Sequence, residues 1–389
     1  MTHRCKRLGL VAWIITVILA LSPAQSFALP HQTEWVLVGS GHKNVCLFVL
    51  DLASGALTPT GDIAQVDAPT FLATWPNRWN LFYAITEGRR KEDSFVSAFR
   101  IDSVKSLTFL NRQPAGGTGP CYVAVDQSGG NVLVANYNSG SVSVFPVDKR
   151  GALGPMSAFI QDHGSSINPR RQEGPHAHCI VTDRDDRFAF ACDLGLDKVM
   201  VYKFDPSKGS LVANDPPFAS VKPGAGPRHI VFHPNRRHAY VINELASTLT
   251  AFAYDRHKGV LSEIEEYPLL PKDFKGQNTA AEVAVHPSGK FVYASNRGDD
   301  SIVVFGCDTD TGRLNFIERD SSEGKTPRNF EIDPPGAFLL AANQDSGTVV
   351  VFRIDTKTGR LQPTGNKAVA DMPMCVKCLG LTRNFEGQQ

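Results

Sequence analysis

The sequence lacks an excess of either charge. Its 40 Lys and Arg residues balance 39 Asp and Glu residues, which leaves a formal net charge of +1 over 389 residues. This balance predicts no nucleic-acid partner and no general attraction to an anionic membrane. A hydrophobic fraction of 42% with 20% charged residues is typical of a globular protein and excludes intrinsic disorder. The 33 Gly and 25 Pro residues favour many short elements over a helical bundle.

The sequence also lacks an apolar run long enough to span a bilayer. The apolar stretch at 8–21 is shorter than the ~20 residues that a membrane helix needs, and Arg4 and Arg7 precede it. Small residues at Ser26 and Ala28 follow, which completes the pattern of a secretory signal peptide. We therefore predict a signal peptide over 1–28 and an exported product, periplasmic or secreted, without a membrane span. The remaining residues, 29–389, are predicted to form one domain.

Patterns typical of disulfide frameworks, metal sites and serine hydrolases are missing. Seven cysteines remain after the leader, an odd number without framework spacing. Cys375 and Cys378 form a single Cys-x-x-Cys pair without a second pair, so we expect buried apolar cysteines. His176 and His178 would share one face of a strand, but no further zinc ligand stands at a diagnostic spacing. We predict no metal and no cofactor, and the absence of Gly-x-Ser-x-Gly argues against an α/β-hydrolase elbow.

Seven internal repeats organise residues 29–389. Each contains an Asp, a short polar gap and Gly-x-Leu or its remnant, from 51–57 to 355–361, and the leucines recur every 46 to 58 residues. Runs of β-branched and aromatic residues, such as 198–202 and 348–352, predict strands. A period near 50 residues with about four short strands is typical of a β-propeller blade.

The repeat begins and ends in the middle of a blade. Residues 35–57 supply a second, third and fourth strand without a first, and residues 372–379 look like the missing first strand. Pairing the two ends closes a ring and removes the exposed sheet edges. We therefore predict an all-β fold, a seven-bladed β-propeller closed by N-terminal strands that pair with the C-terminal strand.

Alignment of the repeats separates scaffold positions from chemically unusual ones. An Asn or Asp recurs at the end of the second strand and indicates a structural role; these residues are Asn136, Asp193, Asn243, Asn296 and Asn343. The next position has no common chemistry; it holds Tyr137, Leu194, Glu244, Arg297 and Gln344. The start of the first strand varies likewise; the polar residues there are His176, His178, Arg228, His229, Glu282 and Arg328. Because these two positions adjoin in an antiparallel hairpin, they are predicted to meet at one rim near the propeller axis.

This rim offers the groups that acyl chemistry on an anionic substrate requires. From the residues alone we predict that the catalytic groups are His176 and/or His178, Arg228, Glu244 and Arg297. Arginines bind carboxylate, phosphate or a developing oxyanion, while Glu activates water and His completes the proton transfers. We predict seven substrate-binding residues: Tyr137, His178, His229, Glu282, Arg328, Asn343 and Gln344. The alternative is that these residues form inter-blade ion pairs such as Glu244–Arg297, and Arg170 and Arg171 are interpreted as a solvated loop surface.

Several motifs resemble those of a known family. They are GPHAH at 174–178, GPRHIVFHP at 226–234, YVINE at 240–244 and SNRGDDSI at 295–302. With these motifs the chain resembles the propeller lactonases, which include bacterial 6-phosphogluconolactonase of the propeller type and fungal carboxy-cis,cis-muconate cyclase. The resemblance implies a seven-bladed propeller with a lactone-handling site at one mouth, and it implies the catalytic roles on His176, Arg228, Glu244 and Arg297.

Three functional hypotheses follow. The favoured one is an exported lactonase that opens a small anionic or sugar-derived lactone, with Glu244 as general base, Arg228 and Arg297 on the substrate anion and oxyanion, and His176 assisting proton transfer. The second is a muconate-type lactone cycloisomerase, which these residues do not distinguish from a hydrolase. The third is a non-catalytic propeller that serves as a binding platform outside the cytoplasm.

Overall fold

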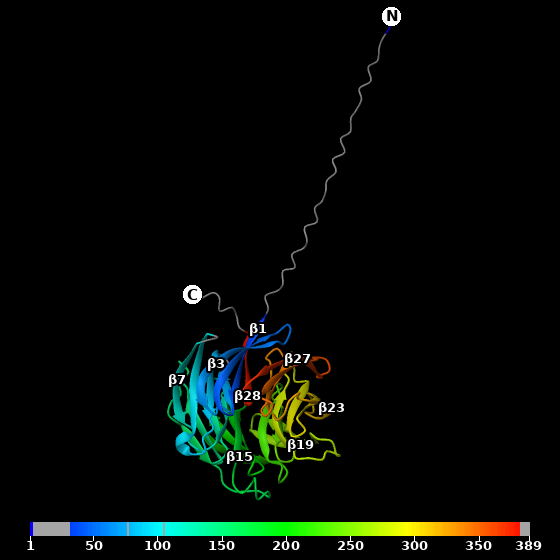
Figure 1. Cartoon of the computed structure of the whole chain (residues 1–389). Coiled ribbons are helices and arrows are strands. Elements are labelled where there is room, and N and C mark those ends of the chain that lie inside the picture. Colours follow the sequence, from blue (N-terminus) through cyan, green and yellow to red (C-terminus); the bar gives the residue numbers. More distant parts are fainter. Residues whose placement is uncertain (3–31, 76–77, 104–105, 382–389) are drawn as a thin grey trace. The chain divides into compact units, whose positions relative to one another are not determined.

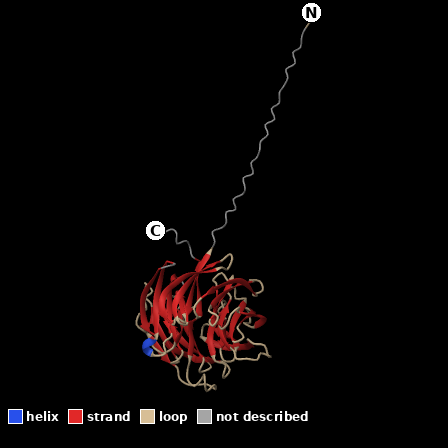
Figure 2. Ribbon diagram, in the orientation of Figure 1, coloured by secondary structure: helices blue, strands red, loops and turns tan. Residues whose placement is uncertain are grey.

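The fold was analysed in a computed structural model that describes residues 1–2, 32–75, 78–103 and 106–381. The predicted signal peptide lies almost wholly outside the described residues. From Gln32 onward the described chain is a β-propeller built from antiparallel sheets (Figures 1 and 2). The helix in this part is a short 3-10 turn, η1 (Lys91–Asp93). No helix among the described residues is long and apolar enough to cross a membrane.

Seven four-stranded sheets form the blades. The first contains β28 (Pro373–Leu381), β1 (Thr33–Ser40), β2 (Lys43–Asp51) and β3 (Leu57–Asp67). The second contains β4 (Leu72–Trp75), β5 (Arg78–Thr86), β6 (Phe95–Ser103) and β7 (Ser106–Pro114). The third contains β8 (Pro120–Val125), β9 (Asn131–Asn136), β10 (Ser141–Pro146) and β11 (Ala158–Gln161).

The remaining four blades repeat this order. The fourth contains β12 (Ala177–Thr182), β13 (Phe188–Asp193), β14 (Lys198–Asp205) and β15 (Ser210–Ser220). The fifth contains β16 (Pro227–Phe232), β17 (His238–Asn243), β18 (Thr248–Asp255) and β19 (Val260–Pro268). The sixth contains β20 (Thr279–Val285), β21 (Phe291–Arg297), β22 (Ser301–Cys307) and β23 (Leu314–Ser321). The seventh contains β24 (Pro327–Ile332), β25 (Phe338–Asn343), β26 (Thr348–Ile354) and β27 (Leu361–Val369).

The two ends of the described chain close the ring as the sequence predicts. Strand β28 pairs with β1 in antiparallel register, with Val38 opposite Val376 and Val36 opposite Cys378. In Figure 1 the red C-terminal strand lies beside the blue N-terminal one. Strand β28 is therefore the first strand of the first blade, and its pairing with β1 closes the ring.

The recurring Asp and Gly-x-Leu pattern forms the turn between the third and fourth strands. Gly359 has a φ of +76°, which a glycine adopts without strain, and Leu361 enters the core immediately after the turn. The hydroxyl of Tyr293, a buried residue of the preceding blade, donates to the carbonyl oxygen of Gly359 at 2.7 Å. Tyr240 and Gly312 repeat the contact at 3.1 Å one blade earlier. The repeat is therefore an inter-blade connection as well as a turn.

The first strands of the blades surround the propeller axis, and each begins beside the end of its second strand. Pro227 lies opposite Asn243, and Pro327 lies opposite Asn343. The Asn and Asp side chains of this column are fully buried. Asn243, for example, donates to the hydroxyls of Thr248 and Thr250 on the next strand, β18. The predicted scaffold role of these Asn and Asp residues is confirmed. The residue that follows each of them, such as Glu244 after Asn243, begins the loop at the rim.

The cysteines behave as the sequence predicts. All seven that the structure describes are free, and Cys375 and Cys378 are buried. Their strand, β28, packs inside the ring, so burial raises the pKa of the Cys375 thiol to about 12 and keeps it neutral. These cysteines therefore pack as small apolar side chains.

Candidate functional site

One buried carboxylate gathers three arginines at the predicted rim. Glu244 directly follows β17, and its backbone N–H donates to the carbonyl oxygen of Gly226 at 2.7 Å, which fixes the start of the loop. Its Oε1 accepts from Arg171 Nη2 at 2.7 Å. Its Oε2 lies 3.1 Å from Arg228 Nε and 3.0 Å from Arg297 Nη2. We call Arg171, Arg228 and Arg297 the arginine cluster.

The arginine cluster is graded in depth. The side chain of Arg228 is 3% exposed, that of Arg297 is 12% and that of Arg171 is 39%. Arg228 is also fully engaged, because its Nη1 donates to the carbonyl oxygen of Ala281 at 2.6 Å. Arg297 in contrast keeps its buried Nε without a hydrogen-bond partner among the described residues. Arg228 is therefore the most deeply buried of the three guanidinium groups, and Arg171 is the most exposed.

The electrostatics of the site follow from this arrangement. Burial alone would raise the pKa of Glu244, but Arg297, Arg228 and Arg171 outweigh it and lower that pKa to about 2. Burial lowers the pKa of Arg297 to about 10 although Glu244 opposes the change, so this guanidinium stays charged at neutral pH. Three guanidinium groups against one carboxylate leave a surplus of two positive charges. The arrangement can therefore attract an anion or a developing oxyanion.

Two histidines and a tyrosine form one wall of this opening. The ring of His176 stacks on that of Tyr137, with 4.5 Å between centroids, and its Nδ1 donates to the Tyr137 carbonyl oxygen at 3.0 Å. Its Nε2 lies 3.3 Å from a carboxylate oxygen of Glu173. His178 is buried, and its Nε2 lies 3.9 Å from Glu244 Oε2. Burial and the neighbouring Arg228 lower the pKa of His178 well below its usual range, so it is neutral.

The predicted residues His229 and Glu282 lie deeper than the opening. His229 Nδ1 donates to Glu282 Oε1 at 2.9 Å, and Arg228 Nη1 lies 3.1 Å from His229 Nε2. Asn329 donates to the other oxygen of Glu282. Burial lowers the pKa of His229 to about 4 although Glu282 opposes it, so the imidazole is neutral and accepts from Arg228. These residues support Arg228 from below.

The blade-seven residues take three different positions. Asn343 is fully buried, and its amide donates to the carbonyl oxygen of Ser322 at 2.9 Å, so it belongs to the scaffold under the rim. Gln344 lies at the rim, where its amide nitrogen is 3.2 Å from Asp345. Arg328 is half-buried, and within the described ranges its guanidinium makes no hydrogen bond or ion pair. Arg328 therefore adds a charge that is available to a ligand.

Sequence reasoning missed Arg171. We interpreted Arg170 and Arg171 as a solvated surface, and for Arg171 this was wrong, because its guanidinium bonds both Glu244 and the hydroxyl of Tyr137, the latter at 3.1 Å. Arg171 lies in the long loop between β11 and β12, outside every repeat column, so the repeat alignment gave no signal. The adjacent Arg170 is exposed.

The candidate site has no recognisable metal centre. In the part of the chain that the structure describes, no group of three or more His, Cys, Asp or Glu side chains is placed to hold a metal ion.

The chain is similar to known proteins over nearly all of the propeller. The sequence model of the family described as "Lactonase, 7-bladed beta-propeller" matches residues 35–378. A 6-phosphogluconolactonase of Bacillus subtilis (strain 168) is 38% identical over 292 residues, which are 75% of this chain and 81% of the relative. A 6-phosphogluconolactonase of Formosa agariphila is 34% identical over 288 residues, 73% of this chain and 80% of the relative.

A solved structure agrees with these relatives. The periplasmic gluconolactonase of Pseudomonas aeruginosa superposes with a TM-score of 0.83 at 30% identity, covering 89% of this chain and 99% of that one. The fold and the rim thus define a seven-bladed propeller whose rim site combines one carboxylate with three guanidinium groups. The chain belongs to the seven-bladed β-propeller lactonase family. This membership confirms the resemblance, the predicted fold and the assignment to an enzyme family of lactonases.

Proposed function

We propose that the chain hydrolyses a carbohydrate-type lactone, as 6-phosphogluconolactonases do, at the rim that holds Glu244. The observation that carries this proposal is one buried carboxylate held by three guanidinium groups, of which Arg171 is 39% exposed and Arg297 keeps a buried Nε without a partner among the described residues. The names of the relatives support the same reaction class. A binding platform would not need this combination of acid, base and guanidinium groups.

In the proposed reaction, water adds to the lactone carbonyl carbon and a tetrahedral oxyanion forms. Arg297 and Arg171 stabilise this oxyanion and any anionic group of the substrate, while Arg228 holds Glu244 in place. The surplus positive charge of the cluster thus acts where negative charge develops.

Glu244 accepts the proton of the attacking water. The carboxylate is ionised throughout the working pH range, because the arginines hold its pKa at about 2. The oxyanion competes for the same guanidinium groups, and this competition raises the proton affinity of Glu244 as the intermediate forms. As the intermediate collapses, the bond between the carbonyl carbon and the ring oxygen breaks. The proton that Glu244 took from water is returned to this oxygen with the assistance of His176, and the product is a hydroxy acid.

The experiment is a proton-release assay on gluconolactone with and without a 6-phosphate group. Glu244→Gln is expected to lower kcat/KM at least ~100-fold, the usual scale for losing a positioned general base. Arg297→Ala is expected to lower kcat/KM to a similar extent because an oxyanion donor is lost.

The matched control is Glu263→Gln on β19, an exposed glutamate of the same blade, which should leave turnover unchanged. Near-ultraviolet circular dichroism checks that each variant is folded. Undiminished turnover in folded Glu244→Gln would remove Glu244 as the base, and undiminished turnover in both site variants would place hydrolysis elsewhere.

We also propose that the chain is exported. The charged segment, the apolar run at 8–21 and the small residues before position 29 support a cleaved leader. The Pseudomonas relative is named as periplasmic, which is compatible with this location.

A further inference from the structure

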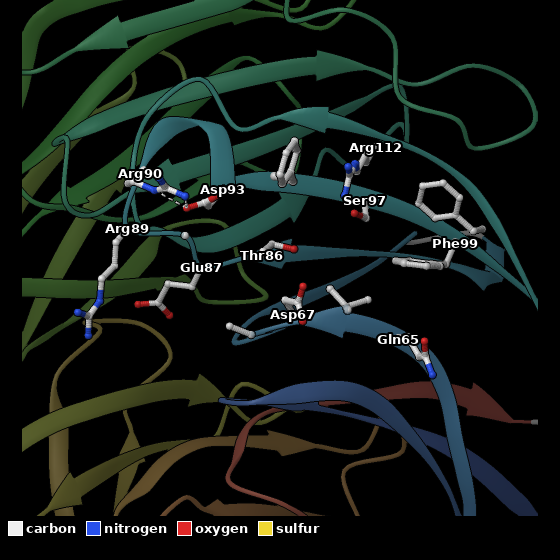
Figure 3. A pocket seen from close by; sticks show the side chains of 15 residues that line it. Gln65, Asp67, Thr86, Glu87, Arg89, Arg90, Asp93, Ser97, Phe99 and Arg112 are labelled. Atoms are coloured by element: carbon white, nitrogen blue, oxygen red, sulfur yellow. Dashed lines mark hydrogen bonds and ion pairs between the residues drawn. The ribbon is translucent and has the colours of Figure 1, made fainter.

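A cavity of about 1010 Å³ lies between the first and second blades. Figure 3 shows Gln65 and Asp67 of β3 on one side and Thr86, Glu87 and Phe99 of the second blade on the other. This volume is at the upper end of the ~300–1,000 Å³ typical of pockets for drug-sized ligands. A single six-carbon lactone is smaller than such ligands and would leave much of the space unfilled.

The inner end of the cavity borders the rim. Glu87 directly follows β5, as Glu244 follows β17, so both occupy the same place in their blades. The carbonyl oxygen of Gly88 accepts from the backbone N–H of Gly119 at 2.8 Å, immediately before β8. The carbonyl oxygen of Gly119 in turn accepts from the backbone N–H of Tyr137, a rim residue, at 2.8 Å. The cavity therefore begins where the rim site ends.

The cavity lining combines unused hydrogen-bonding groups with aromatic faces. The side chains of Gln65, Asp67 and Arg89 are exposed, and among the described residues they form no hydrogen bond or ion pair with another residue. Farther out, Phe99 and Phe109 stand at 59° with 5.5 Å between centroids, and Phe109 is 54% exposed. Hydroxyl groups need such donors and acceptors, and the C–H face of a sugar packs on an aromatic ring.

The charge of the lining favours a neutral occupant. Three arginines face three carboxylates along the cavity; they are Arg89, Arg90 and Arg112 against Asp67, Glu87 and Asp93. Arg90 and Asp93 already neutralise each other at 2.7 Å. In contrast with the rim, where positive charge is in surplus, the cavity has no net charge to hold a phosphate.

We propose that the cavity between the first and second blades is a subsite for a neutral sugar residue attached to the lactone, so that the preferred substrate is a glycosylated aldonolactone. The lactone ring occupies the rim, and the attached sugar passes Glu87 and lies between Asp67 and Arg89. This inference rests on the proposed lactonase function, which it deepens by naming the substrate class.

The test compares gluconolactone with cellobionolactone, which carries a second glucose on the lactone ring. The wild type is expected to show at least ~10-fold higher kcat/KM for cellobionolactone, the effect of one or two additional hydrogen bonds to charged groups. Asp67→Ala and Arg89→Ala should each lower kcat/KM for cellobionolactone by ~10-fold and change that for gluconolactone less than about twofold. The control Arg150→Ala removes an exposed arginine between β10 and β11 and should change neither value.

Two results would overturn the subsite. One is equal kcat/KM of the wild type for both lactones, and the other is an equal loss for both lactones in the two cavity variants. If neither lactone is hydrolysed, the proposed function fails, and calorimetric titration with cellobiose decides the subsite independently. Binding by the wild type that is lost in Arg89→Ala would support the subsite, whereas no binding by the wild type would refute it.

Discussion

Glu34 places a carboxylate inside the strand pair that closes the ring, and replacing it should stabilise the protein at neutral pH. The side chain is 0% exposed. Its Oε1 accepts from the backbone N–H of Gly380 at 2.7 Å, but Oε2 has no partner among the described residues. Burial raises the pKa of Glu34 from 4.5 to about 7, and repulsion from Asp333 and Glu331 adds to it although the Gly380 bond opposes it.

The magnitude and sign follow from linkage between ionisation and folding. Below pH 4.5 the carboxyl is protonated in both folded and unfolded chains, so it has no effect. As pH rises, the unfolded chain ionises first, and the folded state loses ~1.4 kcal/mol per pH unit until the folded group ionises near pH 7. The interval from 4.5 to about 7 therefore corresponds to a loss of about 3 kcal/mol at pH 8. Glu34→Gln, which is neutral at every pH, should avoid this loss.

The assay is urea unfolding of wild type and Glu34→Gln at pH 5 and pH 8. The difference in the free energy of unfolding, variant minus wild type, should be larger at pH 8 than at pH 5 by most of the roughly 3 kcal/mol. Glu323→Gln, at an exposed position, reports the effect of the same chemical change without burial. A difference between Glu34→Gln and wild type that is the same at pH 5 and pH 8 would refute the reasoning.

Two further outcomes are expected. In steady-state kinetics, Arg171→Ala should lower kcat/KM for the lactone at least ~10-fold, because the contact with Glu244 is lost. The control Arg170→Ala, at the adjacent exposed position, should leave kcat/KM unchanged. Equal kcat/KM for the two variants would show that the Arg171 contact does not contribute to turnover. Mass spectrometry of the exported protein should show an N-terminus at Leu29, and a mature chain that retains Met1 would contradict cleavage.

The repeat made most of the fold predictable. A turn glycine and a following leucine, such as Gly359 and Leu361, recur in six of the seven repeats, because the turn favours a positive φ and the leucine packs in the core. The incomplete repeat at each end, 35–57 and 372–379, also predicted ring closure, since an unpaired edge has only one complementary partner in the chain. Local pattern was enough because neighbouring blades make the same contacts.

The repeat alignment also found part of the site. Glu244, Arg228 and Arg297 stand in two columns that share no common chemistry among the blades, and the register of the hairpin brings these two columns together. The same alignment selected Asn343, whose column is buried scaffold, because sequence position does not reveal the depth of a side chain below the rim.

Arg171 illustrates what only the tertiary structure decided. It stands 73 residues from Glu244 in an irregular loop, and no periodic pattern fixes where such a loop lies. The depth order of the three arginines and the cavity between the first two blades likewise depend on how side chains from distant segments fill space. The sequence alone therefore determined the number of blades, their closure and the rim at which unlike residues meet, because these follow from local period and strand register. Which guanidinium groups reach the carboxylate, and what space remains beside them, was decided by long-range packing.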